Sequence, residues 1–198
     1  MPQVITQQLI DNAYTYEAYR AMINENFAQG KTTGNNHSEA MLHYTKMNIQ
    51  RMKRLEKTSK ITAEVAATVK QISSPQIWLI ITEAWCGDAA QSVPVIAKLA
   101  DLNPNIQLRL ILRDEHPNVM DAYLFNGTRS IPKLIVLNAE TLEEMGNWGP
   151  RPKAAQAIID EHKALGSAHE VYVELVHKWY NTDKTVAIQE EPNALLKN

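Results

Sequence analysis

The strongest constraint on the fold is an apolar, β-branched run at residues 77–82 that ends just before the only cysteine of the chain, Cys86. Such a run is typical of a strand buried on both faces. After Trp85-Cys86-Gly87-Asp88, apolar residues recur at helical spacing at positions 89, 90, 93, 96, 97 and 100. The sequence therefore predicts a buried strand, a short turn and a helix that begins at the cysteine.

This position makes Cys86 the first candidate for a reactive group. A lone cysteine is more often an inert core residue. The N-terminus of a helix, however, offers free N–H groups and a partial positive charge, and both favour a thiolate. A depressed thiol pKa would support redox chemistry, whereas a pKa near 8.5 or above would favour an inert relic.

Composition narrows the class of protein. The chain has 198 residues, of which 44% are hydrophobic, and a formal net charge of −2. These values fit a globular protein and argue against a general nucleic-acid partner. One cysteine excludes an internal disulfide framework and fits a reducing compartment. There is no apolar run of membrane-spanning length and no signal-peptide pattern, so we expect a soluble, cytoplasmic protein with no membrane partner.

The chain is expected to be mostly helical before this strand–turn–helix unit, and to contain both strands and helices after it. Residues 1–73 show helical spacing, including a broad apolar face over residues 41–55. The basic residues of this helix indicate a solvated surface, with an anion or partner site as the alternative; Lys46, Lys53 and Lys57 lie beside the apolar face, and Arg51 and Arg54 lie further round. Strands are predicted at 106–112, 133–137 and 142–148, and a helix follows Pro150 and Pro152. A second apolar stripe covers 171–179, and residues 186–198 lack periodicity, so we expect them to be frayed.

Three motifs in order resemble the thioredoxin family. Residues 83–87, Glu-Ala-Trp-Cys-Gly, are similar to the entrance of the thioredoxin active site, whose usual pattern is Trp-Cys-Gly-Pro-Cys. Residues 130–137 resemble the family's cis-proline and following strand, and residues 146–149 resemble its glycine-bearing loop. The resemblance covers residues 74–165. It implies an α/β thioredoxin-like fold, with a central mixed sheet flanked by helices and helical extensions at both ends.

The expected division of the chain follows from this resemblance. Residues 1–73 form an N-terminal helical extension, residues 74–180 a thioredoxin-like domain with an extended C-terminal helix, and residues 181–198 a tail. The two apolar faces at 41–55 and 171–179 must be buried, against each other, against the core or in a homodimer.

Departures from the family pattern matter as much as the matches. The second cysteine is replaced by Ala89, the motif proline by Asp88, the buried acid by Ile80 and the usual lysine of the next strand by Leu110. With one sulfur, dithiol–disulfide cycling within the chain is chemically impossible. Asp88 is expected to be a plain first-turn acid that raises the thiol pKa, with a proton relay as the alternative.

The resemblance also implies a groove beside the cysteine that binds an extended partner. The residues expected to bind the substrate there are Trp85, Gly87, Asp88, Ile131, Pro132 and Gly149. Core packing for Trp85 and a simple turn for Gly149 are the alternatives. Arg129 and Arg151 flank this groove, either as solvated loop charges or as partners of a thiolate or a carboxylate. The six histidines show no zinc-site spacing, so no metal and no cofactor are expected.

These inferences favour a thiol redox protein with the single catalytic residue Cys86. It would act as a monothiol in disulfide exchange or reduction, with protein or small-molecule thiols and disulfides as partners, and an external thiol would resolve the intermediate. The sequence does not decide whether the chain is an enzyme of this kind, that is, a monothiol thiol-disulfide oxidoreductase. A non-catalytic peptide-binding module of the same fold and a peroxide sensor are the competing functions.

Overall fold

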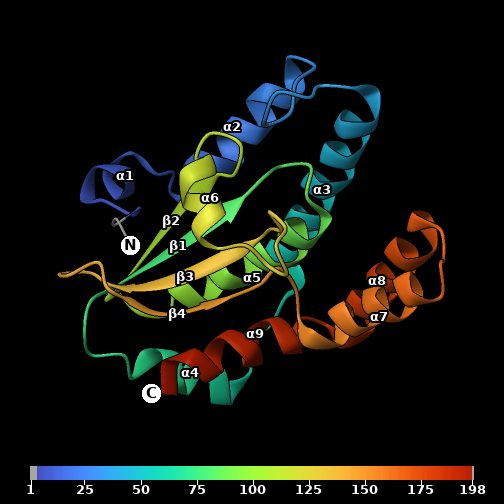
Figure 1. Cartoon of the computed structure of the whole chain (residues 1–198). Helices are drawn as coiled ribbons and strands as arrows, with labels where there is room; N and C mark the ends of the chain where they lie inside the picture. The colour runs from blue at the N-terminus through green and yellow to red at the C-terminus, as the bar shows by residue number, and fades with distance from the viewer. Residues whose placement is uncertain (1–3, 198) are drawn as a thin grey trace.

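A four-stranded mixed sheet lies at the centre of the computed structural model, which describes residues 4–197 (Figure 1). The strands are β1 (Gln76–Thr82), β2 (Ile106–Leu112), β3 (Lys133–Asn138) and β4 (Glu144–Trp148), in the spatial order β2-β1-β3-β4. β1 pairs in parallel with β2 and antiparallel with β3, and β3 pairs antiparallel with β4. This arrangement confirms the predicted α/β fold with a central mixed sheet.

The predicted strand–turn–helix unit forms the middle of the molecule. All seven residues of β1 are buried, as expected for a central strand covered on both faces. Helix α5 (Gly87–Ala100) starts directly after Cys86, which is its N-cap residue. Most of α5 is buried, because α3, α4 and α9 all pack against it. The cysteine is thereby fixed at the end of the most buried strand and the start of the most buried helix.

Four helices precede the sheet. They are α1 (Gln7–Asn12), α2 (Tyr16–Ala28), α3 (Glu39–Thr58) and α4 (Ala63–Lys70). Threonine side chains cap α1, α2 and α4 by accepting a first-turn N–H, which is the usual role of a threonine N-cap. Tyr14 exchanges two backbone hydrogen bonds with Leu110, at 2.9 and 2.8 Å, so the N-terminal segment also lines the free edge of β2. Residues 1–3 of the expected extension lie outside the described residues.

The second half of the chain adds helices on both sides of the sheet. α6 (Pro117–Ala122) connects β2 to β3, and α7 (Lys153–Ala164) and α8 (His169–Asp183) form a hairpin that extends to one side (Figure 1). No helix among the described residues is long and apolar enough to cross a membrane.

The expectation that residues 186–198 are frayed is wrong for the described part of this segment. It forms α9 (Val186–Asn193) and a 3-10 turn, η1 (Ala194–Lys197), while Asn198 lies outside the described residues. Gln189 is fully buried: its amide donates to the Lys60 carbonyl at 3.0 Å and accepts from the Thr62 N–H at 2.9 Å. The helix is held by buried polar side chains as well as by Ile188, so it has little of the apolar periodicity that predicts a helix.

Candidate functional site

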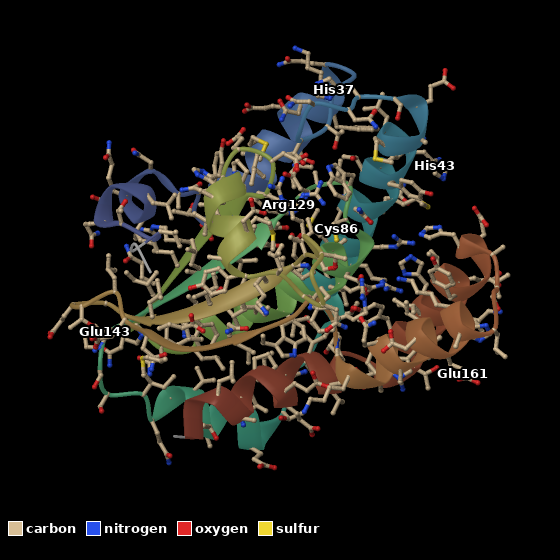
Figure 2. The ribbon with its side chains drawn as sticks, viewed as in Figure 1. His37, His43, Cys86, Arg129, Glu143 and Glu161 are labelled. Carbon is tan, nitrogen blue, oxygen red and sulfur yellow. The ribbon has the colours of Figure 1, made fainter. Side chains whose placement is uncertain are left out.

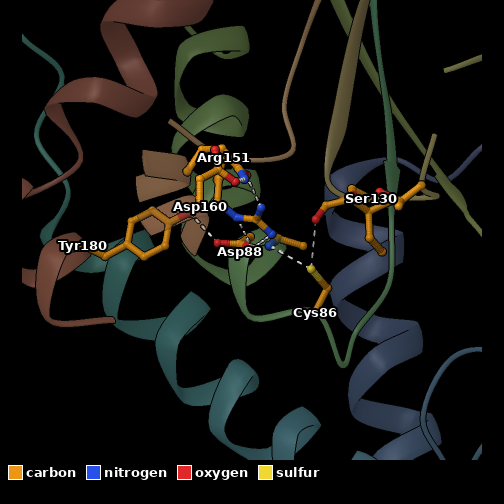
Figure 3. Close-up of polar contacts among 10 residues, drawn as sticks. Cys86, Asp88, Ser130, Arg151, Asp160 and Tyr180 are labelled. Atoms are coloured by element: carbon orange, nitrogen blue, oxygen red, sulfur yellow. Dashed lines mark hydrogen bonds and ion pairs between the residues drawn. The ribbon is translucent and has the colours of Figure 1, made fainter. Parts of the chain in front are cut away.

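The sulfur of Cys86 is held by backbone groups of the first turn of α5 and of the loop that precedes β3 (Figure 3). Its Sγ accepts a hydrogen bond from the Ala89 N–H at 3.4 Å and donates one to the Ile131 carbonyl at 3.3 Å. The residue is 9% exposed, and Figure 2 shows it inside the fold, whereas His37 and His43 lie on the outside. The predicted position at the start of a helix is therefore the observed one.

Three predicted substrate-binding residues, Ile131, Pro132 and Gly149, lie on the loops opposite the cysteine, and the side chains of the first two are buried. Ile131 is only 4% exposed and Pro132 is buried, and the peptide bond between them is cis. Ile131 therefore offers its carbonyl to Cys86, and its side chain joins the core. Gly149 has a φ of +120°, and a Cβ atom there would lie 2.2 Å from the Pro132 carbonyl oxygen. Only glycine allows this close approach of the two loops.

Asp88 lies in the first turn of α5 and raises the thiol pKa, as expected, but it also belongs to a half-buried polar network. Its Oδ2 accepts hydrogen bonds from the Nε and Nη2 of Arg151 at 2.9 and 2.7 Å, and its Oδ1 accepts one from the Tyr180 hydroxyl at 2.7 Å. The Asp88 and Arg151 side chains are only 15% and 16% exposed. Arg151 also donates to Gln156, which donates in turn to Asp160 (Figure 3). The network ties the first turn of α5 to α7 and α8.

The thiol is protonated in this resting state. Burial, followed by the negative charge of Asp88, raises the pKa of Cys86 to about 12. The Ala89 N–H and the Arg151 guanidinium lower the pKa but do not offset these two effects. The helix N-terminus alone would favour a thiolate. The pKa of this cysteine is thus set by its burial and by the Asp88–Arg151 pair.

A cavity of about 520 Å³ opens beside the cysteine. It lies between α3, the start of α5 and the α7–α8 hairpin. Four predicted site residues line it together, namely Trp85, Cys86, Gly87 and Asp88. The apolar faces predicted at 41–55 and 171–179 both contribute to its walls, through Met41 and Tyr44 on one side and Tyr172, Val173 and Val176 on the other.

Among the basic side chains of this cavity, the sequence indicated Arg151 as a charge beside the site and Arg51 only as part of a basic helix, and it did not single out Lys163, His169 or His177. Arg51 and His177 flank Gly87: a Cβ atom at Gly87 would lie 3.2 Å from the His177 ring and 3.7 Å from Nη1 of Arg51. Arg51 Nη1 donates to Asn48 Oδ1 at 2.9 Å, and Asn48, which is fully buried, donates to the Ala84 carbonyl at 2.9 Å. The available signal was Asn48, an amide in the middle of an apolar helical face. A buried amide needs partners, and one of them is the guanidinium next to the site.

Trp85, which lines the cavity, and Arg129, which does not, each contact another charged side chain. Trp85 stacks under the Arg113 guanidinium at 4.6 Å. Arg129 pairs with Asp121 at 2.6 Å, and both side chains are about half exposed, at 52% and 50%, so Arg129 is a surface charge. Glu83 is 1% exposed and accepts the Asp114 N–H at 3.0 Å with one oxygen, while its other oxygen has no partner. Within residues 4–197, no cluster of three or more potential ligands could hold a metal ion.

Sheet order, cysteine position and opposing loops together define a thioredoxin-like protein, and the sequence comparison agrees. The family model described as Thioredoxin matches residues 34–163, about two thirds of the chain, so the chain belongs to this family. Membership supports a thiol redox role at a general level. The match already begins ahead of α3, so it includes part of the segment that we expected to be an extension.

Solved structures share the fold over almost the entire chain. A protein of unknown function from Pseudomonas aeruginosa is 17% identical, with a TM-score of 0.62, and the alignment covers 96% of this chain and 95% of that one. An HIV epitope-scaffold is also 17% identical, with a TM-score of 0.60, and covers 96% of each chain. At this identity the likeness concerns the fold alone. No curated protein matches the sequence.

Proposed function

We propose that the protein is a monothiol disulfide-exchange protein in which Cys86 is the nucleophile and an external thiol completes the cycle. The observation that carries this proposal is the position of the only sulfhydryl, at the N-cap of α5 and on the wall of a cavity, with Ala89 where a second cysteine would stand. Cys86 can form an intermediate but has no neighbouring thiol to resolve it.

The exchange proceeds in two balanced steps. Cys86 loses its proton, and the thiolate attacks one sulfur of a disulfide; the S–S bond breaks, and the leaving thiolate takes up a proton. The product is a mixed disulfide on Cys86. An external thiol then attacks the ligand sulfur of this mixed disulfide, a new disulfide leaves, and Cys86 regains its proton. In one cycle, one external thiol and one disulfide enter, and one thiol and one new disulfide leave, so Cys86 returns to its starting state and no other reductant is needed.

The raised thiol pKa gives this reaction a specific pH dependence. The folded thiol stays protonated well above neutral pH. Below the thiol pKa, the thiolate fraction rises about tenfold for each increase of one pH unit. The exchange rate should therefore keep rising through the alkaline range, where an unperturbed thiol with a pKa of about 8.5 would level off.

Intact mass after incubation with glutathione disulfide tests the proposal. We expect one stable adduct on the wild-type protein and none on Cys86→Ser. Insulin reduction with dithiothreitol should be poor, because the chain lacks a resolving thiol. Ala89→Cys, which restores a second cysteine on the same helix turn, should increase it. A folded protein that stays unmodified up to alkaline pH, and reacts only after denaturation, would contradict a redox role.

The raised pKa of Cys86 favours a second candidate, a binding module in which the thiol is inert. In that case the cavity would hold a ligand without any covalent step. Cys86→Ser separates the two functions, because it abolishes exchange chemistry but leaves a non-covalent binding site intact.

A further inference from the structure

The cavity beside Cys86 carries an excess of positive charge. Its cationic lining residues are Arg51, Arg151 and Lys163, against a single carboxylate, Asp88. Asp88 is already neutralised by Arg151. Among residues 4–197, no carboxylate pairs with Arg51 or Lys163. We propose that this cavity binds a small thiol, or its disulfide, that carries carboxylate groups. This inference rests on the proposed exchange function and names its substrate class.

Arg51 is the main recognition group. Its guanidinium is half-buried and held in place by Asn48, which is itself fixed to the Ala84 carbonyl. One hydrogen bond to Asn48 leaves most of its five N–H donors free for a ligand. A carboxylate matches a planar guanidinium in charge and in geometry. Because Arg51 lies beside Gly87, a carboxylate bound there is close to the sulfur.

His177 adds a second polar group in the same place. Its Nε2 would lie 3.6 Å from a Cβ atom at Gly87, whereas its Nδ1 is buried away from the cavity. Burial, followed by the charge of Arg51, lowers the pKa of His177, so the ring is neutral at physiological pH. A neutral imidazole nitrogen can exchange one hydrogen bond with a polar ligand, and the Nε2 edge is the one that a ligand beside Gly87 would meet.

The apolar walls and the volume limit the size and character of the ligand. Tyr44, Tyr172 and Val176 face the cavity and suit a short hydrocarbon segment. A volume of about 520 Å³ lies in the range of small-molecule sites, about 300–1,000 Å³. Lys163, an exposed residue of the lining, offers a second cation at a distance from the sulfur. The cavity therefore suits an amphipathic thiol of peptide-fragment size with carboxylates at its ends.

The first experiment measures binding without any chemistry. S-methylglutathione, which has two carboxylates and no free sulfhydryl, is titrated into the full-length wild type, Arg51→Gln and Lys53→Gln by calorimetry. Lys53 is the matched control, because it is an exposed cation on the same helix. We expect Arg51→Gln to weaken binding about tenfold or more, as for loss of one charge-assisted hydrogen bond. Lys53→Gln should leave it unchanged.

The second experiment compares disulfides of opposite charge. Mixed-disulfide formation on Cys86 is followed by intact mass with dithiodipropionate, which is anionic, and cystamine, which is cationic. We expect the anionic disulfide to react faster with wild type, and the preference to shrink in Arg51→Gln and at high salt. Lys163→Gln should also reduce the preference for the anionic disulfide. Because Lys163 is exposed, this substitution is not expected to destabilise the fold.

The outcomes separate this inference from the proposed function. Equal rates for the two disulfides, together with equal binding by Arg51→Gln and Lys53→Gln, would overturn the carboxylate site while exchange itself stands. S-methylglutathione binding that depends on Arg51, with no adduct on Cys86 at any pH, would support the carboxylate site and overturn the exchange function. No binding of S-methylglutathione to wild type would overturn the inference.

Discussion

Replacing Asp88 with asparagine should make Cys86 a stronger nucleophile. After burial, the Asp88 charge is the largest influence that raises the pKa of the thiol. Two unit charges about 6 Å apart, at an effective dielectric constant of about 20, interact by about 3 kcal/mol, or about 2 in pKa. Arg151 offsets part of this effect in the wild type and would act on the thiolate alone in the variant. We therefore expect Asp88→Asn to lower the pKa of Cys86 by about 1 to 2.

The thiolate fraction near neutral pH should then rise by about 10- to 100-fold. The assay is the far-ultraviolet absorbance of the thiolate as a function of pH, together with the rate of alkylation by iodoacetamide. Asparagine can still accept the Tyr180 hydrogen bond, but the half-buried Arg151 loses its counter-charge, so a thermal melt must show that the variant is folded. Arg151→Gln should have the opposite effect and raise the thiol pKa.

Asp121→Asn is the matched control, because Asp121 also pairs with an arginine but lies on the surface and does not affect Cys86. A folded Asp88→Asn variant with the same thiol pKa as wild type and Asp121→Asn would refute the reasoning. Burial alone would then set the pKa.

Three further predictions concern stability. Gly149→Ala should lower the free energy of unfolding by about 3 kcal/mol or more, because its Cβ would collide with the Pro132 carbonyl; Gly166→Ala, with no atom within 4 Å, should cost only about 1 kcal/mol in urea titrations. Burial raises the pKa of the Glu83 carboxyl in the folded protein above its ordinary value. Ionisation of Glu83 therefore destabilises the fold. The loss of stability begins as the pH rises above the ordinary glutamate pKa and is complete above the raised pKa of the folded state. Glu83→Gln should then melt at a higher temperature than wild type at neutral pH but not in acid, below the ordinary glutamate pKa. Deleting residues 1–60 removes α3 from the buried face of α5 and should give an aggregating protein in size-exclusion chromatography; a monomer that melts like the full chain would contradict this.

The sequence predicted the centre of the fold because each signal there is local. The apolar run of β1, the spacing of α5 and the position of Cys86 between them follow from residues adjacent in the chain. The opposite outcome at α9 has a physical reason. Gln189 is buried through hydrogen bonds to residues more than a hundred positions earlier, and a polar side chain gives no sign of such distant partners.

The cavity beside Cys86 could not be predicted for the same reason, because its lining residues come from distant parts of the chain. Arg51 on α3, Lys163 on α7 and His177 on α8 line one cavity only in the folded chain, where the α7–α8 hairpin faces α3. Helical periodicity placed Arg51 away from the apolar face of its helix, where a solvated charge is the usual outcome. The charge excess of the cavity is a tertiary property, because the cations Arg51 and Lys163 belong to elements far apart in sequence.

The order in which the site is assembled has a consequence for protein synthesis. Cys86 emerges from the ribosome before Ile131, whose carbonyl accepts the thiol hydrogen bond, and before the later strands and helices of the fold that buries it. Because burial is the main cause of the raised pKa, a nascent chain exposes its single thiol at an ordinary pKa, near 8.5, until the fold has formed around it. Oxidants and small disulfides in the cell meet a more reactive cysteine on the growing chain than on the finished protein. Translational pausing between these segments would thus increase the share of molecules whose cysteine is modified before the fold closes over it.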